Sequence, residues 1–214
     1  MTSHLRARRA ARRLVAAAVG VLVLAGCSRD SSSPGRHGAI HGVVHDSAGA
    51  GVAYAVVHAV RVPVSGQPIE IASADADGLF SISLDQPGTY LVGARGIDDV
   101  AVDTVVVPSV SGQPAAETTF VAMTLVAGGV FTGTATAAGP PNDAGTVVVA
   151  DGWLAIATTD STGRYRLEAM ATGTWPVIAT RTGYRAATTT GTLPAPGDSV
   201  ELAPMVLPVV APAP

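Results

Sequence analysis

The chain has 214 residues, with 13 Lys plus Arg against 16 Asp plus Glu. Every basic residue is an arginine and five of them precede residue 27, so residues 27–214 carry eight arginines, sixteen acids and a net charge of −8. This balance argues against a nucleic-acid partner and against electrostatic docking on anionic lipid, because both require basic patches. Val and Thr are abundant, Gly and Pro supply residues for turns, and long helix-forming stretches rich in Leu, Glu and Lys are missing, so the composition favours short strands with tight turns over helices.

The N-terminus has the three-part organisation of an export signal. Five arginines within residues 6–13 precede an unbroken run of Leu, Val, Ala and Gly at 14–25. This run suits a signal peptide and is shorter than the about 20 apolar residues that a spanning helix needs. It closes on Leu24-Ala25-Gly26-Cys27, which resembles the lipobox of bacterial lipoproteins. The resemblance implies that Cys27 is acylated, with groups such as palmitate, and that the chain is cut before it.

Cys27 is the only cysteine, so the chain offers it no disulfide partner. An unpaired thiol is reactive in an exported protein unless it is used, although a chance thiol behind an ordinary signal peptide is the alternative. Several acyl chains on one residue exceed the two signals needed for stable membrane anchoring. We therefore expect a signal peptide at 1–26 and a lipidated, flexible tether at 27–37. Ser28 differs from the Asp of the inner-membrane retention signal, which favours the outer membrane in a double-membraned host.

The remaining chain contains one unit twice. An Asp-x-x-Gly-x-aromatic motif at 75–80 recurs at 160–165, and Gly88-Thr-Tyr90 recurs as Gly173-Thr-Trp175, each 85 residues later. The opening glycines of the two units are 91 residues apart, at 38 and 129, which fits a longer loop at 63–68 in the first unit. We predict one domain at 38–126, a more divergent one at 127–209, and a Pro-rich tail at 210–214.

Each unit is predicted to be a seven-stranded antiparallel β-sandwich, which makes the chain all-β. Apolar residues alternate in Phe80-Ser-Ile-Ser-Leu84, as in a strand with one buried face. Gly78 and Gly163 stand at hairpins, where a positive φ is needed and glycine adopts it at little cost. The predicted strands of the first unit are 39–45, 53–62, 69–74, 79–84, 89–94, 100–107 and 117–125. Those of the second are 130–136, 145–151, 153–159, 164–169, 174–180, 184–190 and 198–206.

The first unit opens with Gly42-Val-Val-His-Asp46-Ser-Ala-Gly49, followed by the Asp-x-x-Gly-x-Phe and Gly-x-Tyr motifs. This order of motifs resembles the carboxypeptidase regulatory-like domain. The resemblance implies a transthyretin-like sandwich of the carbohydrate-binding-like fold group. The second unit keeps the middle motif but lacks the aspartate of the opening pattern and carries Trp175 where Tyr is usual. The motifs describe turns and core positions, so they indicate a fold and not an activity.

Three histidines, His37, His41 and His45, share the parity of the first predicted strand. Residues four apart on a strand are separated by about 13 Å, which is too far for them to share one metal ion. A metal site would need a ligand from a neighbouring strand, and His58 is the only other candidate histidine. Polar residues on a solvated strand face are the interpretation we favour.

Asp75 and Asp77, before the first hairpin glycine, resemble part of a calcium-binding loop. Calcium needs six or more oxygen ligands, and the second unit has Asp160 but Thr162 at the matching positions. Asx turns explain both versions, so neither a metal nor another cofactor is expected. The chain also has no nucleophile-elbow pattern and no phosphate-binding glycine loop, so we expect that it is not an enzyme.

These patterns predict an exported lipoprotein that is held on a membrane through acylated Cys27 and acts as a non-catalytic binding or spacer module. Its partner would be an envelope protein or a glycan. One alternative is carbohydrate binding through exposed aromatic residues, for which the candidates are Tyr54, Trp153, Trp175 and Tyr184. A second alternative is an accessory subunit of an envelope transport or protease complex.

Repeated strand positions are expected to place one group of aromatic residues in the two cores: Phe80, Tyr90, Tyr165 and Trp175. Trp153 lies off the repeat pattern, directly after the Asp151-Gly152 turn. We therefore expect Trp153 to be exposed, which makes it the one weak candidate for a ligand-binding residue.

Overall fold

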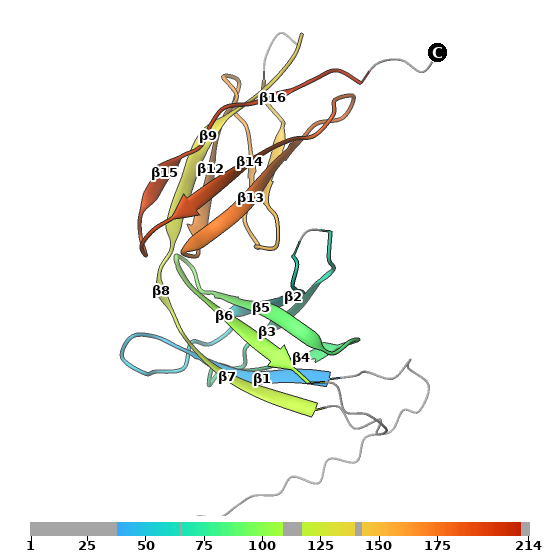
Figure 1. The fold of residues 1–214 in the computed structure, drawn as a ribbon. Coiled ribbons are helices and arrows are strands. Elements are labelled where there is room, and N and C mark those ends of the chain that lie inside the picture. The colour runs from blue at the N-terminus through green and yellow to red at the C-terminus, as the bar shows by residue number, and fades with distance from the viewer. Residues whose placement is uncertain (1–37, 65, 109–116, 140–142, 211–214) are drawn as a thin grey trace, which may run out of the picture. The chain divides into compact units, whose positions relative to one another are not determined.

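The computed structural model describes residues 38–64, 66–108, 117–139 and 143–210, which lie in one compact unit. The described residues form sixteen strands. Figure 1 shows the fold, coloured along the chain from the N- to the C-terminus. The described residues contain no helix that is long and apolar enough to span a membrane. The first eight strands are β1 (Gly38–His45), β2 (Val56–Arg61), β3 (Ile69–Ser73), β4 (Leu79–Leu84), β5 (Gly88–Arg95), β6 (Asp99–Val107), β7 (Glu117–Thr124) and β8 (Val126–Ala127). The others are β9 (Gly129–Ala137), β10 (Val147–Ala150), β11 (Ile156–Thr158), β12 (Arg164–Met170), β13 (Gly173–Thr180), β14 (Ala187–Leu193), β15 (Ser199–Glu201) and β16 (Met205–Leu207).

The first half of the chain forms a sandwich of two sheets. One sheet has the order β4-β1-β7, and in it β1 is antiparallel to β4 and parallel to β7. The other has the order β3-β2-β5-β6-β8 and is antiparallel throughout. Alternating side chains from both sheets, among them Ile40, Val57 and Val92, are fully buried in the core between them. The predicted sandwich is confirmed.

The second half repeats this plan. Its sheets have the orders β12-β9-β15 and β11-β10-β13-β14, and β16 pairs with the far end of β9. Here too the opening strand is central, antiparallel to one neighbour and parallel to the other. Phe131, Leu167 and Leu207 are fully buried in its core. The all-β fold class predicted from the sequence is therefore confirmed.

A glycine on each opening strand makes room for an aromatic ring of the neighbouring strand. Gly42 pairs with Phe80, and a Cβ on Gly42 would lie 2.6 Å from the ring. Gly133 pairs with Tyr165 in the same way, at 2.7 Å from the hydroxyl. The two rings are each 5% exposed, as are Tyr90 and Trp175, so the predicted core positions of these four aromatic residues are confirmed.

The strand boundaries differ from the predicted ones mainly in the second half. The predicted strand at 184–190 begins at Ala187, and the predicted last strand at 198–206 is divided into β15 and β16. The short strand β8, which pairs with β6, was not predicted. Since β8 consists of residues 126 and 127, it lies across the expected domain boundary, which stays a prediction. Gly78 and Gly163 have φ values of 81° and 79°, as their hairpin positions require.

Candidate functional site

The lipobox cannot be placed in the fold. Leu24, Ala25, Gly26 and Cys27 lie outside the described residues, as do His37 and the tether. The first described residue, Gly38, begins β1, which is the central strand of its sheet. The described part of the chain therefore begins in the sheet formed by β4, β1 and β7.

Trp153 is buried, so the expectation that it is exposed is wrong. Only 3% of the residue is accessible, and its indole Nε1 donates a hydrogen bond of 2.9 Å to the carbonyl oxygen of Ala169. Its ring lies 5.1 Å from that of Trp175 and 4.9 Å from that of His58. The turn at Asp151-Gly152 thus directs the indole into the protein, where its face is covered and offers no platform for a sugar.

Gly93 makes this contact possible. It pairs with His58 across β5 and β2, and the two residues lie on the face of the sheet that is opposite the first core. A Cβ on Gly93 would lie 2.2 Å from His58 and 2.5 Å from Trp153. The absence of a side chain at Gly93 therefore creates the space in which the imidazole and the indole meet.

His58 packs in this contact as a neutral side chain. It is fully buried, and neither ring nitrogen makes a hydrogen bond of normal geometry to a described residue. Burial lowers the pKa of His58 to about 4, and the nearby backbone of Gly152 opposes this shift only in part. Because a buried charge without a partner is costly, the imidazole is uncharged at neutral pH. It is neither exposed nor on a solvated strand face, which corrects the favoured interpretation for this histidine.

The two sandwiches meet through further contacts around these rings. Arg95 Nη1 donates a hydrogen bond of 2.6 Å to the carbonyl oxygen of Leu154, and the Gly128 amide donates to the carbonyl oxygen of Asp98. Val100, on β6 of the first sandwich, is 1% exposed and belongs to the second hydrophobic core. The contact therefore combines buried apolar side chains with hydrogen bonds, as specific protein interfaces do.

The other described histidines are not close together. His41 lies on the outer face of β1 between Ser81 of β4 and Phe120 of β7. His45 Nδ1 is 3.3 Å from the hydroxyl of Thr124, at the far end of β1. His58 belongs to the other sheet, and the described residues contain no group of three or more potential metal ligands.

The predicted Asx turns are confirmed. Asp75 Oδ1 accepts hydrogen bonds from the amides of Asp77 and Leu79, both at 2.9 Å. Asp160 Oδ1 accepts the equivalent bonds in the second sandwich and also one from the Thr162 hydroxyl at 2.7 Å. That hydroxyl is the main reason why the pKa of Asp160 is lowered. These carboxylates shape the hairpins before Gly78 and Gly163.

Two exposed aromatic residues stand out on the first sandwich. Tyr54 is 74% exposed and has a φ of 60°, which is unusual for a bulky residue. Phe120 is 64% exposed and was not among the residues expected at the surface. The sequence around Phe120 could have indicated this exposure. The buried Val121 and Met123 alternate along β7, so Phe120 and Ala122 face outward. Tyr184 is partly buried, with the Arg181 guanidinium 5.8 Å from its ring.

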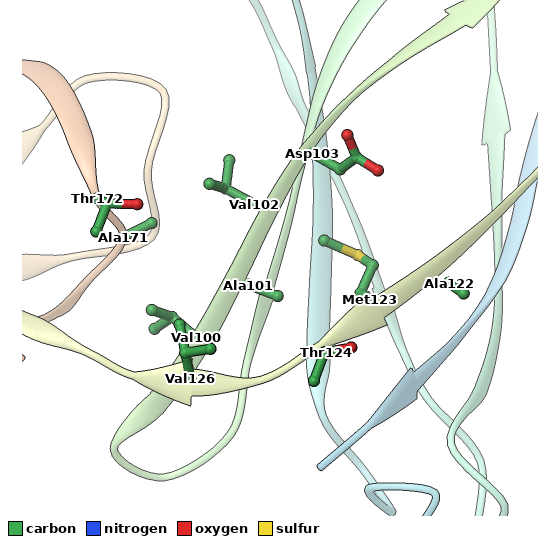
Figure 2. Close-up of a pocket in the computed structure, with 10 residues that line it drawn as sticks. All are labelled: Val100, Ala101, Val102, Asp103, Ala122, Met123, Thr124, Val126, Ala171 and Thr172. Atoms are coloured by element: carbon green, nitrogen blue, oxygen red, sulfur yellow. The ribbon is translucent and has the colours of Figure 1, made fainter. Parts of the chain in front are cut away.

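A small cleft of about 170 Å³ lies between β6 and β7 and reaches the turn at Ala171. Figure 2 shows Asp103 of β6 and Met123 of β7 on its two walls. The cleft is smaller than the about 300 Å³ typical of ligand pockets. Asp103 alternates with buried Ala101 and Val105 but is itself exposed.

A larger open groove of about 580 Å³ adjoins the contact between the sandwiches. Its lining is mainly apolar and hydroxylic, from residues such as Leu91, Val102, Thr174 and Pro176, and Asp103 is its one charged lining residue. The groove is large enough for a small ligand or a peptide segment. It has no cluster of polar groups aimed at one point, so its chemistry does not specify a reaction.

No known protein family matches the chain, and no curated protein matches it. Among solved structures, the shaft pilin SpaA from Lactobacillus rhamnosus GG is similar at 10% identity and a TM-score of 0.34, covering 83% of this chain and 99% of the pilin. GBS52, a minor pilin of Streptococcus agalactiae, has 13% identity, a TM-score of 0.34, and coverages of 83% and 98%. The Bacillus anthracis TIE protein has 14% identity, a TM-score of 0.32, and coverages of 81% and 34%. Because these identities and TM-scores are low, the fold assignment rests on the strands and sheets of this chain and not on the similar structures.

Proposed function

We propose that this protein is an exported lipoprotein of the cell envelope that acts as a non-catalytic binding or spacer module. The observation that carries this proposal is the motif Leu24-Ala25-Gly26-Cys27, which closes a short apolar run and contains the only cysteine. Acyl chains on Cys27 would anchor the protein to a membrane. Ser28 favours the outer membrane if the host has two membranes.

The arrangement of polar residues supports a binding or spacer role over catalysis. A general base and a nucleophile must lie within hydrogen-bonding reach of each other. His58 is buried in the contact between the sandwiches, His41 lies on the opposite sheet, and Asp75 and Asp160 hold hairpins. His58 thus serves packing and the two aspartates shape turns, which is consistent with a module that holds a partner away from a membrane.

The anchor is tested by metabolic labelling with an alkyne-bearing palmitate in a lipoprotein-producing bacterium. We expect the wild-type protein to carry the label and the Cys27→Ser variant to carry none. Ser28→Ala, which changes the neighbouring residue and keeps the thiol, serves as the matched control and should retain the label. Equal labelling of wild type and Cys27→Ser would refute the anchor.

Carbohydrate binding is a second candidate function, and the exposure of Tyr54 is the observation that favours it. An aromatic ring presents an apolar face on which a sugar can stack, and Tyr54 keeps its exposed position despite an unfavourable φ. We expect the mature protein to bind insoluble envelope polysaccharide in a pull-down if this candidate is right. Tyr54→Ala should then reduce binding at least several-fold, whereas Tyr184→Ala should not.

A further inference from the structure

The outer face of the sheet β4-β1-β7 carries no Asp, Glu or Arg side chain among the described residues and is in part apolar. Two rows of side chains cross it, Ser81–His41–Phe120 and Leu79–Val43–Ala122. Phe120 is 64% exposed and Leu79 is 49% exposed. Among the described side chains, none of those that point outward from these three strands belongs to Asp, Glu or Arg.

The second sandwich shows that the fold does not require such a face. At the register positions that match Ser81 and Phe120, the sheet β12-β9-β15 carries Arg166 and Glu201 on either side of Thr132. Arg164 stands where the first sandwich has Leu79. The same architecture thus tolerates charges at these positions, so their replacement by Ser, Phe and Leu points to a specific contact on the first sandwich.

The position of the anchor indicates what covers this face. Residue 38, at the start of β1, is eleven residues from Cys27, a distance that an extended chain spans in at most about 40 Å. We propose that this face rests on the bilayer that holds Cys27, with Phe120 and Leu79 at the level of the lipid headgroups; the inference depends on the proposed lipid anchor. The rest of residues 27–214 is strongly acidic, so a face without carboxylates meets the least repulsion at an anionic surface.

A second copy of the chain fits the face less well. Three strands about 4.8 Å apart and about 25 Å long present roughly 350 Å². A stable protein–protein interface needs about 800 Å² from each partner. A tethered surface needs much less, because the anchor keeps it at a high effective concentration near the lipid. Weak insertion of a few apolar side chains is therefore enough to orient the protein.

The docking can be tested by labelling an introduced cysteine. Once Cys27 is acylated, the mature protein has no other thiol that would take the label. A cysteine introduced by Ser81→Cys can be labelled with a fluorophore in the lipidated protein, and Arg166→Cys gives the matched control on the second sandwich. Both would be reconstituted into vesicles of phosphatidylcholine and phosphatidylglycerol that contain a headgroup-nitroxide lipid. We expect strong quenching of the label at 81 and little quenching of the label at 166.

Two variants copy the charges of the second sandwich onto the face, Phe120→Glu and Leu79→Arg. Each should abolish the quenching at 81 while the protein still floats with the vesicles and keeps its β-type circular dichroism. Equal quenching at 81 and 166, or quenching that persists in both variants, would overturn the docking. A wild-type protein that does not float with vesicles would instead overturn the lipid anchor, and the docking with it.

Discussion

The imidazole of His58 and the indole of Trp153 meet edge to face, with their ring centroids 4.9 Å apart and their planes at 78°. The two residues come from different sandwiches, and both are almost completely buried. Aromatic pairs of this geometry contribute about 0.5–1.5 kcal/mol beyond the burial of their area. This contact makes the stability of each sandwich depend on the other.

We predict that Gly93→Ala destabilises the protein by about 1–3 kcal/mol, as is usual for overpacking. The new methyl group would lie within 2.5 Å of both rings, which cannot move apart in a packed contact. Urea denaturation of the mature protein measures the effect. Gly96→Ala is the control and should cost less, because its methyl group would lie 3.1 Å from the flexible end of Leu125 and at an ordinary contact distance of 3.6 Å from the Asp99 carbonyl oxygen.

The stability should fall as the pH drops from about 6.5 to about 4. An unfolded chain protonates His58 near pH 6.5, whereas burial lowers its pKa in the folded protein to about 4. Between pH 6.5 and pH 4 the unfolded state binds one more proton than the folded state does. The free energy of unfolding therefore falls by about 3 kcal/mol over this range. His58→Leu should remove this part of the pH dependence, and His41→Gln should retain it. Parallel denaturation profiles for wild type and His58→Leu would contradict the prediction.

Tyr54 and Gly145 provide a reciprocal test of backbone strain. The two residues lie at matching points of the two sandwiches, and their φ values are 60° and 87°. The residue after Tyr54 accepts a hydrogen bond at its carbonyl oxygen from the Ala74 amide, and the residue after Gly145 accepts one from the Thr159 amide. Left-handed φ costs a non-glycine residue about 1–2 kcal/mol, partly offset by the larger entropy that glycine loses. Tyr54→Gly should therefore stabilise the protein by up to about 1 kcal/mol, and Gly145→Tyr should destabilise it similarly. Thermal unfolding of the two variants and the wild type measures these changes in stability. A loss of stability in Tyr54→Gly would show that the tyrosine makes a favourable contact.

Tyr165 and Phe80 occupy the same repeated position, but only Tyr165 buries a hydroxyl group. That hydroxyl has no hydrogen-bond partner among the described residues, and burial raises the pKa of Tyr165 to about 12. Tyr165→Phe should stabilise the protein by about 1 kcal/mol or more, and Phe80→Tyr should destabilise it by about as much, since a buried unpaired polar group costs about 1–3 kcal/mol. The wild type should also lose stability as the pH rises from 10 towards 12, and Tyr165→Phe should lose less. Equal free energies of unfolding for wild type and Tyr165→Phe would count against an unpaired hydroxyl.

The sequence was sufficient to predict the two sandwiches because their signals are local. Alternation located β4 at 79–84, and the repeated glycines located the hairpins at Gly78 and Gly163. The burial of Trp153 was not predictable in this way, because it depends on Gly93, sixty residues earlier and in the other sandwich. The last strand was predicted as one piece because its apolar residues do not reveal where the pairing with β9 is interrupted.

The central position of β1 also has a kinetic consequence. β1 pairs with β7 in a parallel register that joins Gly38 to Glu117, so its sheet cannot be completed until almost the whole first half of the chain is present. The second sandwich has the same requirement, because β9 must wait for β15 and β16. Pairing between distant segments forms slowly, since the entropy of closing a long loop is lost before the contacts stabilise it. A chain that emerges with its N-terminus first should therefore remain unfolded long after its first strand has appeared. This property suits passage through a narrow channel.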